Sequence, residues 1–363
     1  MKNKIKIIAS GGGTISHTIP LVEVLKQLDK NVFEILYIIS NEGPEFEIIK
    51  NEFSYKKIYV GKIYRNIDLR NIINIFKNLV GIVQAKIIFL SFKPDLVICK
   101  GGYVTIPIIF WSIIFNKKLI IHESDSVLGF ANKFASKYAK KILTAFDKKY
   151  YPKELAKKIE VCGIPLRKEF VSASIDRARH TQKSVLVIGG SQGAKTLNQF
   201  VVNNLSKFID NNIRVIHVWG ESNNKEARIF YDGLSEKYKK LYDYYLFIDK
   251  NISSIINSTD LVVTRCGATI MAELSKLNKA AVFVPYPYAS QDHQECNAKI
   301  ILDTDSGIII KDDQLDSKAS NIIDLLNDEK GLKKYQNNIN KLMPENSTEK
   351  FVQVIEEITN AKK

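Results

Sequence analysis

Three short turns rich in glycine or alanine are the first candidates for chemistry in this sequence. Each follows an apolar run typical of a β-strand and precedes a helical pattern, at residues 11–13, 189–193 and 267–268. Such a turn lets backbone N–H groups approach an anion, and the dipole of the following helix favours negative charge there. The turns therefore predict a phosphate-bearing ligand. The sequence has no P-loop, and its glycine spacing is wrong for the dinucleotide site of a nicotinamide or flavin dehydrogenase.

Polar residues beyond the third turn are suited to a sugar nucleotide. Glu273 follows Gly267 and Ala268 by about one and a half helical turns, where a carboxylate can accept hydrogen bonds from both ribose hydroxyls. Taken alone, Glu273 is more typical of a solvent-exposed helix position. A polar loop at residues 285–297 follows the next apolar run, and its amides suit the hydroxyls of a sugar. His293 in this loop has a second interpretation, as a helix-start residue with no ligand role.

These turns need a scaffold of alternating strands and helices. The strand candidates are the apolar runs at residues 5–10, 34–39, 96–99, 119–121, 141–144, 185–188, 215–219, 245–248, 261–264 and 281–284. Helical periodicity lies between them, beginning near Thr18 with Pro20 in the first turn. The alternation predicts an α/β protein with two doubly wound parallel-sheet domains. Ligands bind such sheets at the carboxyl ends of the strands, so we expect the site in the cleft between the domains.

Length and composition fit this organisation. The chain has 363 residues, which suits two domains. Its formal net charge of +14 favours an anionic partner, although the lysines are dispersed as in a lysine-rich proteome. The four cysteines lack the spacing of a zinc site or a disulfide framework, which indicates reduced thiols. The longest uninterrupted apolar run, at residues 106–115, is too short to span a membrane, so we expect membrane contact without insertion.

Eight segments in a fixed order give the sequence a family resemblance. It resembles the MurG family of bacterial transferases, in glycosyltransferase family 28, through GGGTISHTIP, GGYVTIP, HESDSVLGFANKFASKYA, GIPLR, GGSQGAKTLN, FID, RCGATIMAEL and DHQECNA. The resemblance implies a GT-B fold, with two Rossmann-like domains facing across a cleft. The N-terminal domain at 1–162 would bind acceptor and membrane, and the C-terminal domain at 163–345 would bind UDP-GlcNAc. A C-terminal helix at 346–363 would return to the N-terminal domain.

The resemblance also implies an activity. Members of the family transfer N-acetylglucosamine, with inversion, from UDP-GlcNAc to the C4 hydroxyl of MurNAc in lipid I, which is undecaprenyl-diphospho-MurNAc-peptide. The product, lipid II, serves peptidoglycan synthesis, and through it cell shape and cell division. No metal or other cofactor is implied, and we interpret the Asp-x-Asp at 303–305 as a loop. The implied partners are UDP-GlcNAc, lipid I, the anionic membrane surface and cell-wall synthesis proteins. The implied location is the cytoplasmic face of the inner membrane, as a peripheral protein.

Site residues follow from the same resemblance. On the donor side they are Arg167, Phe247 and Ile248 at the uracil, Ser191, Gly267 and Ala268 at the diphosphate, Glu273 at the ribose, and Gln294 at the GlcNAc hydroxyls. On the acceptor side they are Thr14, Ile15, Ser16 and His17 beside the two sugars, and Asp125 near the GlcNAc.

Two residues depart from the common family pattern and bear on catalysis. Ser16 stands where many relatives have glycine, and Asp125 stands where many have asparagine. The acceptor hydroxyl must lose a proton to a base as it attacks, and backbone amides suit the negative charge of departing UDP. His17 is the first candidate base, and Asp125 and Glu123 are its rivals. A second interpretation of His17 is a residue that only orders the turn.

An apolar surface rimmed by cations is predicted in the N-terminal half. In residues 67–93 the apolar members are Ile72, Ile75, Phe76, Leu79, Val83 and Ile87, and the cations are Arg70, Lys77 and Lys86. Residues 106–115 add Trp111, followed by Lys117 and Lys118. This combination suits an anionic bilayer surface. The alternative is that these residues are ordinary buried helix faces.

Two other functions stay open at this point. Another GT-B enzyme, such as a glycolipid synthase or a UDP-GlcNAc 2-epimerase, would share the donor site, and the lipid acceptor distinguishes them because an epimerase needs none. A basic nucleic-acid-binding protein would have clustered Lys and Arg with aromatic stacking platforms. The dispersed lysines disfavour it, and nucleic acid is not an expected partner.

Overall fold

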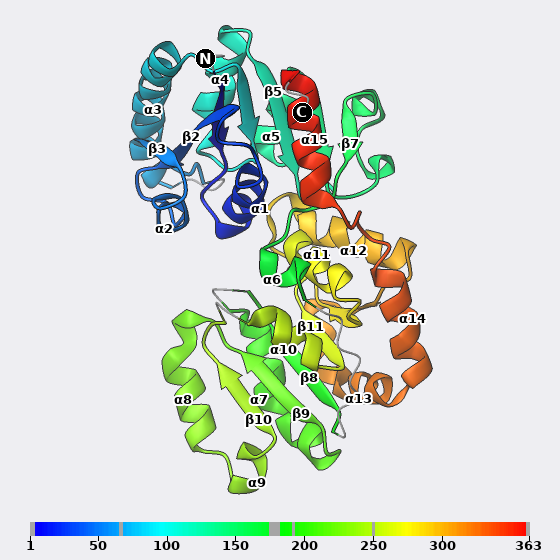
Figure 1. Ribbon diagram of the computed structural model, residues 1–363. Helices are drawn as coiled ribbons and strands as arrows, with labels where there is room; N and C mark the ends of the chain where they lie inside the picture. The colour runs from blue at the N-terminus through cyan, green and yellow to red at the C-terminus, as the bar shows by residue number, and fades with distance from the viewer. Residues whose placement is uncertain (1–3, 65–67, 174–181, 191–192, 249–250, 361–363) are drawn as a thin grey trace. The chain divides into compact units, whose positions relative to one another are not determined.

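The chain folds as two compact units. The computed structural model describes residues 4–64, 68–173, 182–190, 193–248 and 251–360 (Figure 1). Unit 1 combines Met1–Arg167 with Pro344–Lys363, and unit 2 is Lys168–Met343. The chain therefore enters unit 2 after Arg167, whereas the predicted boundary lies after Cys162. Each unit is a parallel sheet with crossover helices, which confirms the predicted α/β class.

Unit 1 is built on seven parallel strands in the order β3-β2-β1-β4-β5-β6-β7. The strands are β1 (Ile5–Ser10), β2 (Phe33–Ser40), β3 (Ser54–Ile58), β4 (Leu96–Cys99), β5 (Lys118–Glu123), β6 (Lys141–Thr144) and β7 (Ile159–Val161). The helices are α1 (Ile15–Leu25), α2 (Glu45–Ile49), α3 (Arg70–Phe92), α4 (Thr105–Ile114), α5 (Phe130–Ser136) and α15 (Ser347–Thr359). All residues of β4, Leu-Val-Ile-Cys, are buried, as expected for a central parallel strand covered on both faces.

Unit 2 repeats this plan with six parallel strands in the order β10-β9-β8-β11-β12-β13. The strands are β8 (Ser184–Ile188), β9 (Arg214–Val218), β10 (Tyr242–Tyr245), β11 (Leu261–Thr264), β12 (Ala281–Phe283) and β13 (Ile308–Ile309). The helices are α6 (Lys168–Val171), α7 (Lys195–Asp210), α8 (Asn224–Asp232), α9 (Glu236–Lys239), α10 (Ile252–Ser258), α11 (Ala268–Lys276), α12 (His293–Asp303), α13 (Ala319–Asn327) and α14 (Glu329–Ile339).

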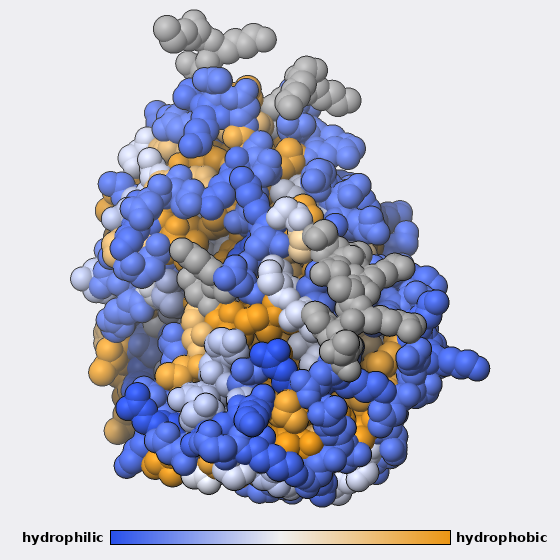
Figure 2. Space-filling model, turned by 60° about the horizontal axis from the view of Figure 1, so that its bottom comes forward, coloured by the Kyte–Doolittle hydropathy of each residue, from blue (hydrophilic) through white to orange (hydrophobic). Residues whose placement is uncertain are grey.

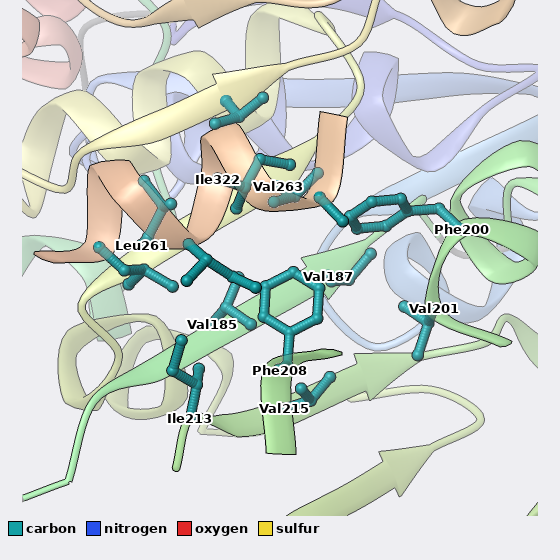
Figure 3. Close-up of a cluster of buried hydrophobic side chains, with 14 of the residues drawn as sticks. Val185, Val187, Phe200, Val201, Phe208, Ile213, Val215, Leu261, Val263 and Ile322 are labelled. Atoms are coloured by element: carbon teal, nitrogen blue, oxygen red, sulfur yellow. The ribbon is translucent and has the colours of Figure 1, made fainter. Parts of the chain in front are cut away.

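Alternate strand residues and helix stripes build the core of each unit. In unit 2, Val185 and Val187 of β8 point to the same face of the sheet, where Phe200 and Phe208 of α7 and Ile322 of α13 cover them (Figure 3). In unit 1, the C-terminal helix α15 contributes its buried stripe to the core and packs on α1 (Figure 1). The stripe consists of Phe351, Val354 and Ile355.

The differences between predicted and observed strands lie at the edges of the sheets. β10 covers Tyr242–Tyr245 instead of 245–248, because Tyr242 is buried and its hydroxyl is hydrogen-bonded to Trp219, whereas Phe247 is exposed. β3, β7 and β13 were not predicted, and each is a short strand at a sheet edge. An edge strand is paired on one side alone and is less buried, so its sequence carries a weaker apolar signal.

Helix α1 begins earlier than predicted. Its first residue is Ile15 instead of a position near Thr18, and Pro20 lies inside the helix instead of in its first turn. Gly13 has a φ of 83°, a conformation that glycine adopts without strain, and it turns the chain directly into the helix. Ile15, Ser16 and His17 therefore lie on the first helical turn and not in a preceding loop.

Helix α3 has an unusual surface for a globular protein. Within the part of the chain that the structure describes, it alone is long and apolar enough to cross a membrane by length and composition, with 23 residues and a mean hydropathy of 1.6. Only 22% of its most apolar window is buried.

Hydrophilic residues cover most of the face of the molecule drawn in Figure 2, and hydrophobic residues form separate patches there.

Candidate active site

Each sheet has one point at which the strand order reverses, and the predicted turns lie at these points. The reversal falls between β1 and β4 in unit 1, and between β8 and β11 in unit 2. Doubly wound sheets bind ligands at the carboxyl ends of the strands beside such a point. The turns after β1 and β4 therefore belong to one candidate site, and the turns after β8 and β11 belong to another.

Side chains from its own unit hold the turn after β1. The carbonyl oxygen of Gly11 accepts a hydrogen bond from the Tyr37 hydroxyl at 2.9 Å and another from the Thr18 hydroxyl at 3.1 Å. The N–H of Gly13 donates to the carboxylate of Glu45 at 3.1 Å. These three contacts fix the turn from within unit 1.

Glu45 is a site residue that the sequence prediction missed. Its side chain is buried, and it accepts hydrogen bonds from the backbone N–H and the hydroxyl of Ser40, at 2.9 and 2.8 Å. Burial, and to a smaller extent the charge of Glu45, raises the pKa of Tyr37. A carboxylate of the protein therefore binds the Gly13 amide that a glycine turn would otherwise offer to an anion. In the sequence Glu45 follows Pro44 and is typical of a helix N-terminus, which gives no sign of this contact.

The predicted acceptor-side residues after this turn are accessible. Thr14, Ile15 and Ser16 are exposed and His17 is half-buried. The hydroxyls of Thr14 and Ser16 lie 3.0 Å apart. The backbone N–H of His17 donates to the carbonyl of Thr14 at 3.2 Å, in the first turn of α1. These residues are thus displayed together at the N-terminus of α1.

Glu123, at the end of β5, organises the loop that follows it. The carboxylate is buried and accepts hydrogen bonds from the N–H groups of Asp125 (3.1 Å) and Gly129 (2.8 Å) and from the Asn132 amide (2.9 Å). Burial, with a contribution from the charge of Asp125, raises the pKa of Glu123. A buried carboxylate that binds three donors shapes the loop, and of the three candidate bases it is the least accessible.

Asp125 lies on the loop that Glu123 organises. It is half-buried, and its backbone carbonyl accepts a hydrogen bond from the Tyr151 hydroxyl at 2.9 Å. His122, two strands from β1 in the same sheet, has its pKa lowered by burial, by Lys100 and by His17. The fold therefore brings the end of β5 and the first turn of α1 within electrostatic range of each other.

The glycine turn of unit 2 connects β8 to α7. Gly190 and Gly193 have φ values of 89° and 78°, which favour glycine at both positions. A side chain at Gly193 would collide with the carbonyl of Trp219. The predicted diphosphate residue Ser191 lies outside the described residues.

The turn after β11 is anchored by a buried ion pair. Gly267 caps α11, Ala268 is its first residue, and both follow the buried residue Arg265. The Arg265 guanidinium donates to the carbonyl of Val284 at 3.2 Å and to the carboxylate of Asp312. Asp312 also accepts a hydrogen bond from the Thr196 hydroxyl at 2.9 Å, at the start of α7. One carboxylate therefore ties together the two turns that flank the switch point of unit 2.

The predicted ribose and sugar residues surround the turn after β11. Glu273 is half-buried on α11. The side-chain oxygen of Gln294, on α12, accepts a hydrogen bond from the Tyr286 N–H at 2.9 Å. The Asn297 amide donates to the carbonyl of Cys266 at 3.1 Å, which links α12 to the turn. The Gln294 amide nitrogen could donate a hydrogen bond to a sugar hydroxyl.

The predicted uracil residues come from two parts of the chain. Phe247 is 41% exposed and Ile248 is half-buried, in the segment after β10. Arg167 is half-buried and directly precedes α6, which packs on α11. Among the residues that the structure describes, no three His, Cys, Asp or Glu side chains are grouped so that they could hold a metal ion.

Comparisons with known proteins agree with this geometry. Residues 7–144 match the N-terminal domain of glycosyltransferase family 28, and residues 184–358 match its C-terminal domain. A Halothermothrix orenii protein is 32% identical over 344 residues, which cover 91% of this chain and 92% of that protein. The chain belongs to glycosyltransferase family 28. The H. orenii relative is named UDP-N-acetylglucosamine–N-acetylmuramyl-(pentapeptide) pyrophosphoryl-undecaprenol N-acetylglucosamine transferase.

Family 28 membership makes this chain a glycosyltransferase and confirms the predicted GT-B class of fold. The crystal structure of Acinetobacter baumannii MurG matches with a TM-score of 0.75, over 98% of this chain and 100% of that one, at 23% identity. A UDP-N-acetylglucosamine 2-epimerase structure matches with a TM-score of 0.66, over 99% and 98%, at 12% identity. At these identities the structural matches concern the fold alone, so the choice between transferase and epimerase depends on the family and its relatives.

Proposed function

We propose that this protein transfers N-acetylglucosamine from UDP-GlcNAc to the C4 hydroxyl of MurNAc in lipid I, with inversion at the anomeric carbon. The observation that carries the proposal is the turn after β11. There, Gly267 and Ala268 open α11 at the switch point of unit 2, and Glu273 lies on the same helix. The names of relatives about 30% identical over nearly the whole chain support this donor and this acceptor.

The reaction requires a base for the acceptor and a positive environment for the leaving UDP. The lone pair of the C4 hydroxyl oxygen attacks the anomeric carbon, its proton passes to the base, and the bond to the UDP oxygen breaks with its electron pair. His17 is our first candidate base because it is accessible in the first turn of α1, and Asp125 is the second. The amides that open α11 would stabilise the UDP diphosphate without a metal.

A transfer assay tests this proposal. We expect labelled UDP-GlcNAc and a short-chain lipid I analogue to give a disaccharide lipid, at the same rate with and without EDTA. Loss of activity in EDTA would contradict metal independence alone. An epimerase would convert UDP-GlcNAc without any lipid, so donor turnover in the absence of lipid I would support that alternative. Well-folded protein that makes no disaccharide lipid would contradict the proposed reaction.

We further propose that α3 lies on an anionic membrane surface without crossing it. One side of α3 is occupied by the segment at 59–64: the side chains of Gln84, Asn78 and Asn71 accept hydrogen bonds from backbone N–H groups of that segment, at 2.8, 2.9 and 2.8 Å. A helix held in this way belongs to the folded sheet unit. A helix that crossed the membrane would be surrounded by hydrocarbon, to which the amide-bearing side of α3 is poorly suited.

The opposite side of α3 supplies the apolar surface. The six predicted residues Ile72, Ile75, Phe76, Leu79, Val83 and Ile87 are each 52–65% exposed, so they are not a buried helix face. Helix α4 packs on α3 and adds Ile106, Phe110 and Ile114, also exposed. Lys86 lies 5.4 Å from the Trp111 ring, which places a cation beside this surface. Apolar side chains next to lysines suit a bilayer with anionic headgroups and a lipid-linked acceptor, at the cytoplasmic face.

Vesicle binding tests the membrane proposal. Phe76→Ser with Leu79→Ser should lower co-sedimentation with phosphatidylglycerol vesicles by at least about tenfold, because each side chain contributes apolar area to the bilayer contact. The matched control is Ile229→Ser with Leu302→Ser, two residues of unit 2 that are 63% and 61% exposed. We expect the control to bind like the unmodified protein. Equal losses in both double variants would contradict a specific role for α3.

A further inference from the structure

Lys100 is a buried cation at the switch point of unit 1. It directly follows β4 and is 1% exposed. Its backbone N–H donates to the carbonyl of Ser10 at 2.9 Å, which joins the turns after β1 and β4. Its ammonium donates a hydrogen bond to the hydroxyl of Ser124. A buried ammonium is unfavourable unless nearby groups compensate its charge, so the neighbours of Lys100 indicate its role.

Two carboxylates compensate the Lys100 ammonium. Glu123 and Asp125, on either side of Ser124, both favour the charged form of Lys100, although burial has the larger effect and lowers the Lys100 pKa overall. Lys100 thus touches the middle residue of a short turn whose two outer residues are acids. The hydrogen bond positions the turn, and the charge acts on both carboxylates at once.

Three other buried titratable groups beside this cluster have pKa shifts that favour their neutral forms. Burial raises the pKa of Cys162, after β7, to about 12, and raises that of Tyr151. Burial, Lys100 and His17 lower the pKa of His122. His17, on α1, acts on His122, and Glu160 and Lys350 act on Cys162. Lys100 is therefore a buried cation on which both acids act directly.

We propose that Lys100 is a positioning residue of the transfer reaction: its buried ammonium holds Ser124 in place and puts a positive charge beside the Glu123–Asp125 turn. The inference rests on the proposed function, because Asp125 is there the acid nearest the reacting sugars. Lys100 itself touches no substrate in this scheme. It acts through Asp125, whether that carboxylate binds the GlcNAc or takes the acceptor proton.

Unit 2 contains a matched control in Lys279. It is also buried, with an exposure of 7%, but its ammonium donates to the backbone carbonyls of Asn257 and Thr259 at the end of α10. Burial lowers the Lys279 pKa to about 8, and the acid that opposes this shift is Asp260, which is not a predicted site residue. Replacing Lys279 therefore removes a buried ammonium of similar environment without touching the proposed site.

The kinetic test compares pH profiles of kcat/KM for the full-length protein with the lipid I analogue. In Lys100→Met the acidic limb should move to higher pH by about one unit, since an opposite charge at short range stabilises a carboxylate by this amount or more. Lys100→Arg keeps the charge and should keep the limb, and Lys279→Met should keep it as well. A Lys100→Met profile that differs from the unmodified protein by a constant factor at every pH would overturn the proposal.

A thermal test needs no substrate. Without Lys100, the folded-state pKa of Glu123 should rise further above its unfolded value. A group of this kind contributes stability at low pH and loses it as the pH rises through the folded pKa. The Tm deficit of Lys100→Met should therefore widen between about pH 5 and pH 8. In the double variant Lys100→Met with Asp125→Asn, the Tm deficit should widen less over this pH range. A Tm deficit independent of pH in both variants would contradict the proposed effect of the Lys100 charge.

The two tests separate failure of this inference from failure of the proposed function. If the unmodified protein makes no product, the proposed function is wrong, and the positioning role in transfer is wrong with it. If the unmodified protein is active but Lys100→Met has an unshifted acidic limb and a Tm deficit independent of pH, only the role of Lys100 is wrong.

Discussion

Replacement of Glu273 by alanine is expected to raise the KM for UDP-GlcNAc about 100-fold, with a much smaller change in kcat. The carboxylate would accept hydrogen bonds from the two ribose hydroxyls, and bonds to a charged group contribute about 1.5–3 kcal/mol each. The ribose does not react, so its contacts should stabilise the ground state and the transition state about equally. Initial rates over a range of UDP-GlcNAc concentrations measure this effect.

Two controls make the Glu273 experiment specific. Lys276 is half-buried on the same helix, and Lys276→Ala should leave the KM for UDP-GlcNAc within about twofold, because the residue lies one turn beyond Glu273. UDP binding by calorimetry should weaken in parallel with the rise in KM. An unchanged KM in a folded Glu273→Ala protein would remove Glu273 from the ribose site.

Replacement of Arg265 by methionine is expected to lower the free energy of unfolding by about 3 kcal/mol, since it leaves one member of a buried ion pair without its partner. The side chains of Arg265 and Asp312 are 10% and 22% exposed. Asp312 would keep its hydrogen bond from Thr196 but would lose the guanidinium that neutralises it. Urea unfolding measures the loss.

A double variant and an exposed ion pair calibrate this prediction. Arg265→Met with Asp312→Asn removes the uncompensated charge, so it should be more stable than Arg265→Met alone. Arg214 and Asp243 form an ion pair whose side chains are 49% and 37% exposed, and Arg214→Met should cost less than about 1 kcal/mol. Equal effects of Arg265→Met and Arg214→Met would show that burial of the first pair contributes nothing.

The central strands were predictable because parallel strands buried on both faces are continuous apolar runs. β4 and β11 agree with the predicted ranges residue by residue. The edge strands β3, β7 and β13 escaped prediction, and β10 was placed three residues late, because edge residues are only partly buried. The start of α1 was also missed, since it depends on the positive φ of Gly13 and on the contacts that hold that turn.

The candidate site also has one part that could be predicted from the sequence and another part that could not. Segments such as 11–20 and 265–274 contain a turn and the start of a helix within ten residues, so their role can be inferred from local order. Glu45 binds Gly13 across 32 positions, and Asp312 binds Arg265 across 47. No local pattern indicates such partners, because an acidic residue is favourable at the start of any helix, whether or not it also binds a distant residue.

The sequence by itself determined the class of fold, the two halves and the turns suited to a diphosphate, because strand burial, helical period and glycine conformation are local properties. Tertiary structure alone decided which charges meet: Lys100 with the Glu123–Asp125 turn, and Arg265 with Asp312. The physical reason is that the cost of a buried charge depends on the groups around it, and parallel strands bring those groups together from distant parts of the chain.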